Sequence, residues 1–86
     1  MRLSSQFVTQ DIDGIQFLIA LGDQKFKGVV RNNRTAAFIV NLLKEETTKE
    51  RIISEMRKTF DAPEEMIAED VDQVLHTLRS IDALEE

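Results

Sequence analysis

The run Gln24-Lys25-Phe26-Lys27-Gly28-Val29-Val30-Arg31 leads into Asn33-Arg34-Thr35-Ala36-Ala37-Phe38-Ile39, and this junction decides the expected fold. The first run is typical of a strand over residues 26–31, with Phe26, Gly28 and Val30 on one face. The second run begins a largely apolar helix, capped by Asn33 or Thr35, that we expect to continue to about Lys44.

Two further strands are indicated upstream of this junction. Phe7-Val8-Thr9 forms the first, and the β-forming run over residues 15–21 forms the second. Asp13-Gly14 is a favoured two-residue turn because both positions tolerate positive φ. A second turn is expected at Gly22-Asp23-Gln24. The three strands make a small antiparallel sheet, which needs helices over one side to be stable.

Two amphipathic helical patterns follow the junction helix. Thr47-Thr48-Lys49-Glu50 has the form of a capping box and opens a helix to about Phe60. Pro63 suits the first turn of the last helix, over residues 63–83. The core stripe of that helix consists of Ile67, Val71, Val74, Leu75, Leu78 and Ile81, and a mixed shoulder beside it consists of Met66, Asp70, Gln73, Thr77 and Leu84.

We therefore predict an α+β fold of the winged helix-turn-helix type, with a three-stranded antiparallel sheet followed by three helices. The 86 residues suit a single domain over residues 1–86, with its core at about 7–84. There is no cysteine for a disulfide or a zinc-thiolate site. The start of the chain lacks an export signal, and the longest apolar run, at residues 17–21, is too short to span a bilayer, so we expect a cytoplasmic protein without membrane contact.

The charge balance opposes nucleic-acid binding. The chain has 16 acidic and 11 basic side chains and a formal charge of -5, whereas nucleic-acid binders need a cationic surface. Charge is nevertheless uneven: residues 25–34 include four basic and no acidic side chains, and residues 61–72 are acidic without a basic one. These segments are either two solvated surfaces or the two sides of a dipolar groove that orients a charged partner.

Residues for catalysis or for cofactor and metal binding are not apparent. Asp11-Ile12-Asp13-Gly14 is similar to a calcium loop, but the twelfth loop position is Gly22 instead of an acid. His76, the only histidine, lies opposite the core stripe of its helix and is expected on the surface. The carboxylates of the last helix suit a solvated face. We expect a protein that is not an enzyme and needs neither cofactor nor metal.

The sequence resembles the pyrroloquinoline quinone biosynthesis protein D (PqqD) family over about residues 7 to 84. Residues 33–43 follow that family's Asn-x-Thr-(Gly/Ala)-Ala-x-Ile-Trp-x-Leu-Leu segment. The opening of the second helix at residues 47–52, the junction at 60–65 and the last helix at 69–78 follow in the same order. Asn32 stands where the family usually has leucine and Val40 where tryptophan is common, and the family's usual Gly-Leu/Ile ending is replaced at residues 81–84. These departures indicate a relative that serves another pathway.

The resemblance implies a peptide-recognition element for ribosomally made, post-translationally modified peptides. Such a domain binds the leader of a precursor peptide as a strand added beside its third strand, in a cleft walled by its third helix. It presents the precursor to a modifying enzyme, which in the namesake pathway is a radical S-adenosylmethionine (SAM) enzyme. The expected function is thus that of a peptide chaperone in peptide natural product biosynthesis.

An open sheet edge offers unpaired main-chain groups that an extended peptide can complete. Gly28 either permits close approach of a peptide or relieves twist, and Met66 either packs in the core or adapts to a ligand. Lys27 and Arg31 either attract acids in a leader or protect the edge by their charge. The expected edge residues are Lys27, Gly28, Val29, Val30 and Arg31, and the expected wall residues are Met66, Asp70, Gln73, Val74 and Thr77.

Two other functions remain open at this point. A small winged-helix DNA-binding protein or adaptor would use the basic residues of the second helix, although Glu50 and Glu55 lie among them. An oligomerising structural module would pair its exposed third strand with a second copy and form a homodimer.

Overall fold

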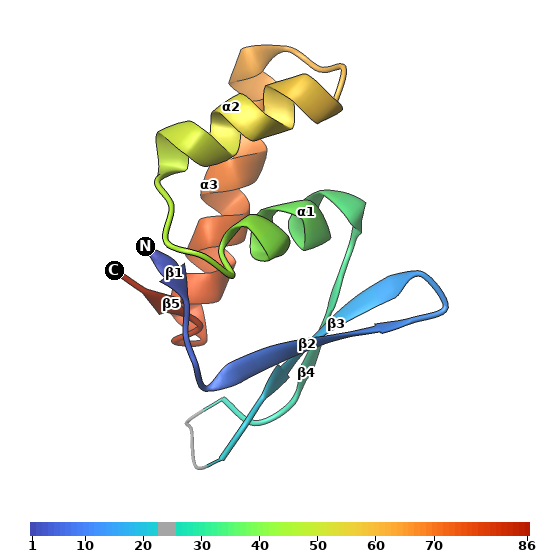
Figure 1. Cartoon of the computed structure of the whole chain (residues 1–86), viewed down its shortest axis with the longest axis vertical. Helices are drawn as coiled ribbons and strands as arrows, with labels where there is room; N and C mark the ends of the chain where they lie inside the picture. The colour runs from blue at the N-terminus through green and yellow to red at the C-terminus, as the bar shows by residue number, and fades with distance from the viewer. Residues whose placement is uncertain (23–25) are drawn as a thin grey trace.

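The sheet expected from the first third of the chain is present in the computed structural model, which describes residues 1–22 and 26–86. Strands β2 (Phe7–Ile12), β3 (Ile15–Ala20) and β4 (Val29–Asn32) pair antiparallel in the order β2-β3-β4. Within the described residues β3 is therefore central, and β4 has a partner on one side only (Figure 1).

The turn at Asp13-Gly14 is confirmed. Ile12 pairs with Ile15, and the two intervening residues have φ values of 52° and 78°, the positive angles that a tight hairpin needs. The hairpin extends the first strand to Ile12, three residues beyond the expected end at Thr9. In the second expected turn, Asp23 and Gln24 lie outside the described residues.

The third strand begins later than expected, at Val29 instead of Phe26. The Phe26 ring is half-buried and stacks on Phe7, with ring centroids 6.4 Å apart and planes at 20°. Gly28 follows with a φ of 156°, an angle that residues with a Cβ rarely adopt. The residues before Val29 thus contribute an aromatic contact instead of a longer ladder.

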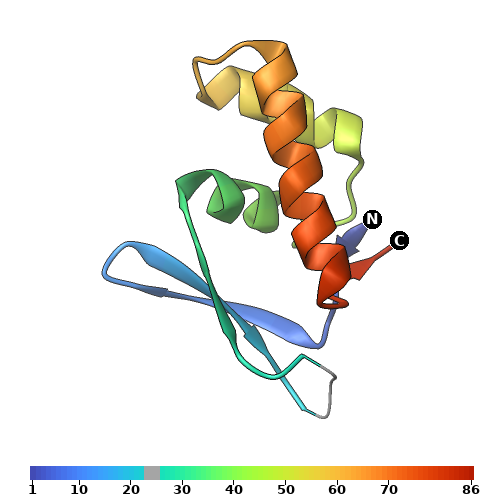
Figure 2. The same ribbon diagram turned by 180° about the vertical axis from the view of Figure 1, so that it is seen from behind.

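Within the described residues, helices α1 (Arg34–Leu42), α2 (Lys49–Thr59) and α3 (Glu64–Ser80) follow the sheet. Figure 2 shows α3 crossing in front of α1 and α2. Asn33 caps α1 as expected, because its Oδ1 accepts a hydrogen bond from the Ala36 amide at 2.8 Å. A three-stranded antiparallel sheet followed by three helices, in a winged-helix-like arrangement, is thereby confirmed for the described chain.

Two helix boundaries differ from the prediction. The prediction of a capping box that begins at Thr47 was wrong. The Oγ1 atom of Thr48 accepts a hydrogen bond from the Arg51 amide at 3.2 Å, so Thr48 is the N-cap of α2. Helix α3 ends at Ser80 and not near Ala83. Asp82 has a φ of 58°, a left-handed angle that stops the helix and turns the chain back.

A two-residue ladder joins the two ends of the chain, and nothing in the sequence pattern predicted it. Strand β1 (Arg2–Leu3) pairs antiparallel with β5 (Leu84–Glu85). The Leu3 amide donates to the Leu43 carbonyl at 2.7 Å, and the Ser4 amide donates to the Ala83 carbonyl at 2.8 Å. The N- and C-termini therefore lie side by side (Figure 1).

The core fills the space between the helices and the inner face of the sheet. Leu18 of β3 is fully buried there with Ile39 of α1, Ile52 of α2 and Val71 of α3. The α3 stripe is buried at Ile67, Val71, Leu75 and Leu78, whereas Val74 and Ile81 are only partly buried. Those two positions lie where the core opens toward β4.

The outer face of the sheet is also apolar. Val8, Ile19 and Val29 are cross-strand neighbours and form a row across β2, β3 and β4. Val8 and Val29 are large exposed hydrophobic residues, and Ile19 between them is half-buried. We call Val8, Ile19 and Val29 the outer row. Each helix among the described residues is too short or too polar to span a lipid bilayer.

Candidate functional site

Strand β4 presents free main-chain groups along its outer edge. The Ala20 amide donates to the Gly28 carbonyl at 3.3 Å, and the register continues with Leu18 opposite Val30 and Gln16 opposite Asn32. In an antiparallel ladder, alternate residues exchange hydrogen bonds with the neighbouring strand. The N–H and C=O groups of Val29 and Arg31 therefore point away from β3, toward the open edge.

The side chains of β4 alternate between the two faces of the sheet. Val30 lies opposite the buried Leu18 and faces the helices together with Asn32, which is itself buried. Val29 is 58% exposed and, with Arg31, lies on the outer face. The edge thus offers an apolar side chain inward and a charged one outward.

A cleft of about 330 Å³ separates the inner face of β4 from α3. Its floor is apolar where Leu18, Val30 and Leu78 meet. Gln73, Thr77 and Asn33 add hydrogen-bonding groups to the lining. The complete lining consists of Leu18, Val30, Arg31, Asn32, Asn33, Ala36, Gln73, Val74, Thr77, Leu78 and Ile81.

The structure brings half of the expected site residues together in this cleft. Val30 and Arg31 from β4 line it opposite Gln73, Val74 and Thr77 from α3. Asp70 lies next to the cleft in an adjoining pocket, and Val29 belongs to the outward edge.

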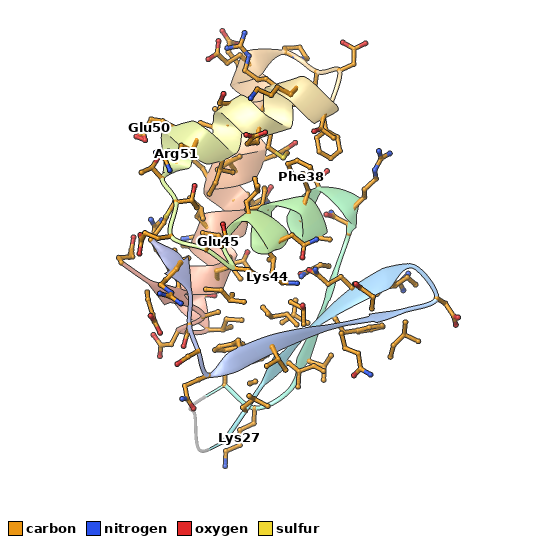
Figure 3. All side chains as sticks on the ribbon, in the orientation of Figure 1. Lys27, Phe38, Lys44, Glu45, Glu50 and Arg51 are labelled. Atoms are coloured by element: carbon orange, nitrogen blue, oxygen red, sulfur yellow. The ribbon has the colours of Figure 1, made fainter. Side chains whose placement is uncertain are left out.

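Three expected site residues lie apart from the cleft lining. Lys27 and Gly28 precede β4, and the Lys27 side chain points away from the helices at the far end of the molecule (Figure 3). Met66 is 54% exposed in the first turn of α3 and is not part of the cleft wall. Nothing in its surroundings suggests that it packs in the core.

The cleft includes residues that the sequence prediction did not assign to it. Ile81 and Leu78 were assigned to the core stripe, and Asn33 was recognised only as a helix cap. Asn32 stands in the sequence as a polar residue at the end of a strand, directly before the cap. The position of β4 was the missing information, because the strand begins three residues later than expected, at Val29, and includes Asn32.

A chain of side-chain amides connects the cleft to the other side of α1. Asn32 Nδ2 donates to Gln16 Oε1 at 2.7 Å, and Gln16 Nε2 donates to Asn41 Oδ1 at 2.9 Å. These groups border a larger, open hollow of about 710 Å³ between the β2–β3 hairpin and α1. The amides satisfy one another, so they fix the orientation of Asn32 at the cleft.

The titratable groups with shifted pKa values lie outside the cleft lining. Hydrogen bonds from Arg79 lower the pKa of the Glu86 carboxyl, and the same pair raises the pKa of Arg79. A hydrogen bond from the terminal amine lowers the pKa of Glu46. Among the described residues, no three His, Cys, Asp or Glu side chains are grouped so that they could hold a metal ion. His76 is exposed, as expected.

The model of the family described as coenzyme PQQ synthesis protein D (PqqD) matches residues 8–84 of this chain. The chain belongs to the PqqD family. The resemblance found in the sequence is therefore confirmed. The comparison with curated proteins finds no match.

Two solved structures share the fold of this PqqD-family chain. One is described as TbiB1 in complex with the TbiA(beta) leader peptide; it has a TM-score of 0.84 and 21% identity, and the match covers 99% of this chain and 95% of that one. The other is described as lasso peptide synthetase B1 complexed with the leader peptide. It has a TM-score of 0.76 and 16% identity, and the match covers 92% of this chain and 89% of that one.

Proposed function

We propose that this protein binds the leader of a ribosomally made precursor peptide as a strand added to the edge of β4. The observation that carries the proposal is the free edge of Val29 and Arg31 beside a cleft walled by α3. Both structurally similar proteins are described as complexes with leader peptides, which supports the same use of the fold here.

The cleft suits a peptide that is bound mainly through its backbone. Main-chain pairing with Val29 and Arg31 gives affinity with little sequence preference, and the space over Leu18, Val30 and Leu78 selects an apolar side chain. The chain then has no reaction to perform. We infer a non-catalytic chaperone that presents the precursor to a separate modifying enzyme, with a radical SAM maturase as the first candidate.

We infer the cytoplasm as the compartment of this protein. A ribosomally made precursor has its leader until modification is complete, so the protein that holds the leader acts in the cytoplasm. We do not propose DNA binding, because three of the four cations of α2 are paired with carboxylates and only Arg51 has no ion pair in the described structure. Lys49 pairs with Asp72, and Arg57 and Lys58 pair with Glu64 and Glu55 at 3.6 Å each.

The test of the proposal removes one outward N–H group from β4. Arg31→Pro deletes the amide that faces the open edge, whereas the bonds to β3 come from Val30 and Asn32. Proline is tolerated on an edge strand when its nitrogen faces solvent. The control is Arg31→Ala, which removes the side chain and keeps the amide.

We expect Arg31→Pro to bind a leader encoded beside this gene at least about tenfold more weakly than Arg31→Ala. One lost main-chain hydrogen bond contributes about 0.5–1.5 kcal/mol, and the proline ring also obstructs the added strand. Calorimetric titration gives the affinities, and chemical denaturation verifies that both variants fold. Equal affinities for the two variants would rule out pairing at this edge.

Amide chemical shifts provide a second readout that needs no mutation. Titration with the leader should shift the amides of Val29 and Arg31 and those of the α3 wall at Gln73 to Thr77. The α2 amides lie outside the cleft lining, so their chemical shifts should not change. Shifts confined to α2 would place the peptide elsewhere on the molecule.

A further inference from the structure

A small polar pocket lies next to the cleft, beyond the C-terminal end of β4. It has a volume of about 110 Å³ and is lined by Asn33, Thr35, Asp70, Gln73 and Val74. Asn33, Gln73 and Val74 also line the cleft, so the two spaces lie next to each other. A strand lying in the cleft would reach this pocket with a side chain next to the one that fills the apolar floor.

Asp70 gives this pocket a negative charge. Its side chain is half-buried, and within residues 1–22 and 26–86 it forms no ion pair. Two other carboxylates of α3 are already neutralised, because Glu64 pairs with Arg57 and Asp72 pairs with Lys49. Asp70 is thus the acid of α3 that faces a cavity and lacks a cation in the described structure.

The positive end of α1 lies at the same pocket and opposes this charge. A helix N-terminus carries about half an elementary positive charge, which is less than the full charge of a carboxylate. The first turn of α1 contains no acidic residue of its own. Arg34 does not add to the positive side, because its guanidinium lies over the Phe60 ring, 5.4 Å from the centroid. The pocket therefore remains net negative.

We propose that the Asp70 pocket selects a lysine or arginine of the leader, next to the apolar side chain that occupies the cleft. Side chains on one face of a strand repeat every two residues, so the basic residue should lie two positions from the apolar one. This inference rests on the proposed leader binding and adds a sequence requirement to it. The alternative is a structural role, in which Asp70 merely complements the dipole of α1.

A displayed library of random peptides of about twelve residues tests this selectivity without a known leader. The intact chain and its Asp70→Asn and Asp70→Lys variants are each used to select binders. We expect the wild-type pool to combine an apolar residue with Lys or Arg two positions away. The basic preference should disappear with Asp70→Asn and become acidic with Asp70→Lys. Whether the basic residue precedes or follows the apolar one then reports the direction of the bound strand.

Glu69→Lys is the matched control, because it changes the same charge on the same helix at an exposed position outside the pocket. It should leave the basic preference in place. In a selected peptide, replacing the basic residue with alanine should weaken binding to the wild type about three- to tenfold and binding to Asp70→Asn less than twofold. A structural role would lower the melting temperature of Asp70→Asn and leave its peptide preference unchanged.

The outcomes separate this inference from the proposed function. Binders that need the β4 edge, as judged by loss of binding to Arg31→Pro, but that lack any charge preference would overturn the role of Asp70 alone. If Glu69→Lys and Asp70→Lys changed the charge preference of the selected peptides equally, the role of Asp70 would also be overturned. A selection that yields no binders, or only binders indifferent to Arg31→Pro, would overturn leader binding itself.

Discussion

At the level of single residues, Asn32 is a polar side chain on the inner face of the sheet, and its hydrogen bonds account for its burial there. The Asn32 side-chain amide is buried and donates to Gln16. Gln16 in turn donates to Asn41, so these polar groups are paired. A buried polar network of this kind costs little as long as every member is present.

Gln16→Ala should therefore destabilise the protein by about 1–3 kcal/mol, because it leaves the buried amide of Asn32 without an acceptor. Gln10→Ala, at an exposed position of the adjacent strand, should change the free energy of unfolding by less than about 0.5 kcal/mol. Urea denaturation measures both. Similar losses for the two variants would mean that the network does not contribute to stability.

The Arg79–Glu86 pair predicts a small acid-dependent contribution. The guanidinium of Arg79 donates to both carboxylate oxygens of Glu86, and these hydrogen bonds lower the pKa of Glu86 below 4.5. A lowered folded-state pKa means that the stabilisation is present above about pH 4.5 and is lost as the pH falls through the folded value. Both side chains are exposed, so the effect should be modest.

Glu86→Gln should accordingly lose stability at neutral pH and show a flatter decline toward about pH 3 than the wild type. The control is Glu69→Gln, which removes an exposed carboxylate of α3 that forms no ion pair in the described structure and should keep the wild-type stability at neutral pH. Denaturation curves across this pH range provide the comparison. A Glu86→Gln profile parallel to that of the wild type would contradict the prediction.

At the level of single elements, Thr47 and Thr48 differ in their roles, because only Thr48 caps α2. Thr48→Ala should cost about 1 kcal/mol, since it removes the acceptor for the Arg51 amide. Thr47→Ala should cost much less, because Thr47 is held through its main chain, with its amide donating to the Met1 carbonyl at 2.9 Å. Thermal denaturation of the two variants distinguishes the cap observed here from the capping box expected at Thr47.

Local signals made most of the elements predictable. The Asp13-Gly14 hairpin depends on two adjacent residues, and the core stripe of α3 depends on a spacing within one helix. Both features can be predicted because residues close together in the sequence determine them. The start of β4 was misplaced because Phe26 leaves the strand to stack on Phe7, about twenty residues away in the sequence. The misplaced strand explains why Asn32 was not assigned to the cleft, whereas Ile81 was left out because its spacing placed it in the core stripe.

At the level of the whole molecule, the pairing of β1 with β5 could not be predicted from the sequence. Each strand of the β1–β5 ladder has only two residues, which is too few to show an alternating pattern. Their partners are about eighty residues apart. Such a contact is specified by the assembled core, where Leu3 and Ala83 are both buried, and not by the strands themselves.

The single free edge of β4 also limits the assembly. A homodimer through this strand and a bound leader would use the same N–H and C=O groups of Val29 and Arg31, so the two states exclude each other. The charge of -5 on each copy further opposes self-association. We expect sedimentation equilibrium to give one chain and one peptide per complex. A complex of two chains and two peptides would contradict this use of the edge.

The alternation along β4 has a consequence for any peptide that joins it. Such a peptide would turn every second side chain into the cleft and leave the others beside the outer row of Val8, Ile19 and Val29. A leader held in this way is only half concealed. The outward-facing side chains of the peptide would stay accessible next to the outer row. A second protein could therefore contact the bound peptide from that side without first displacing it.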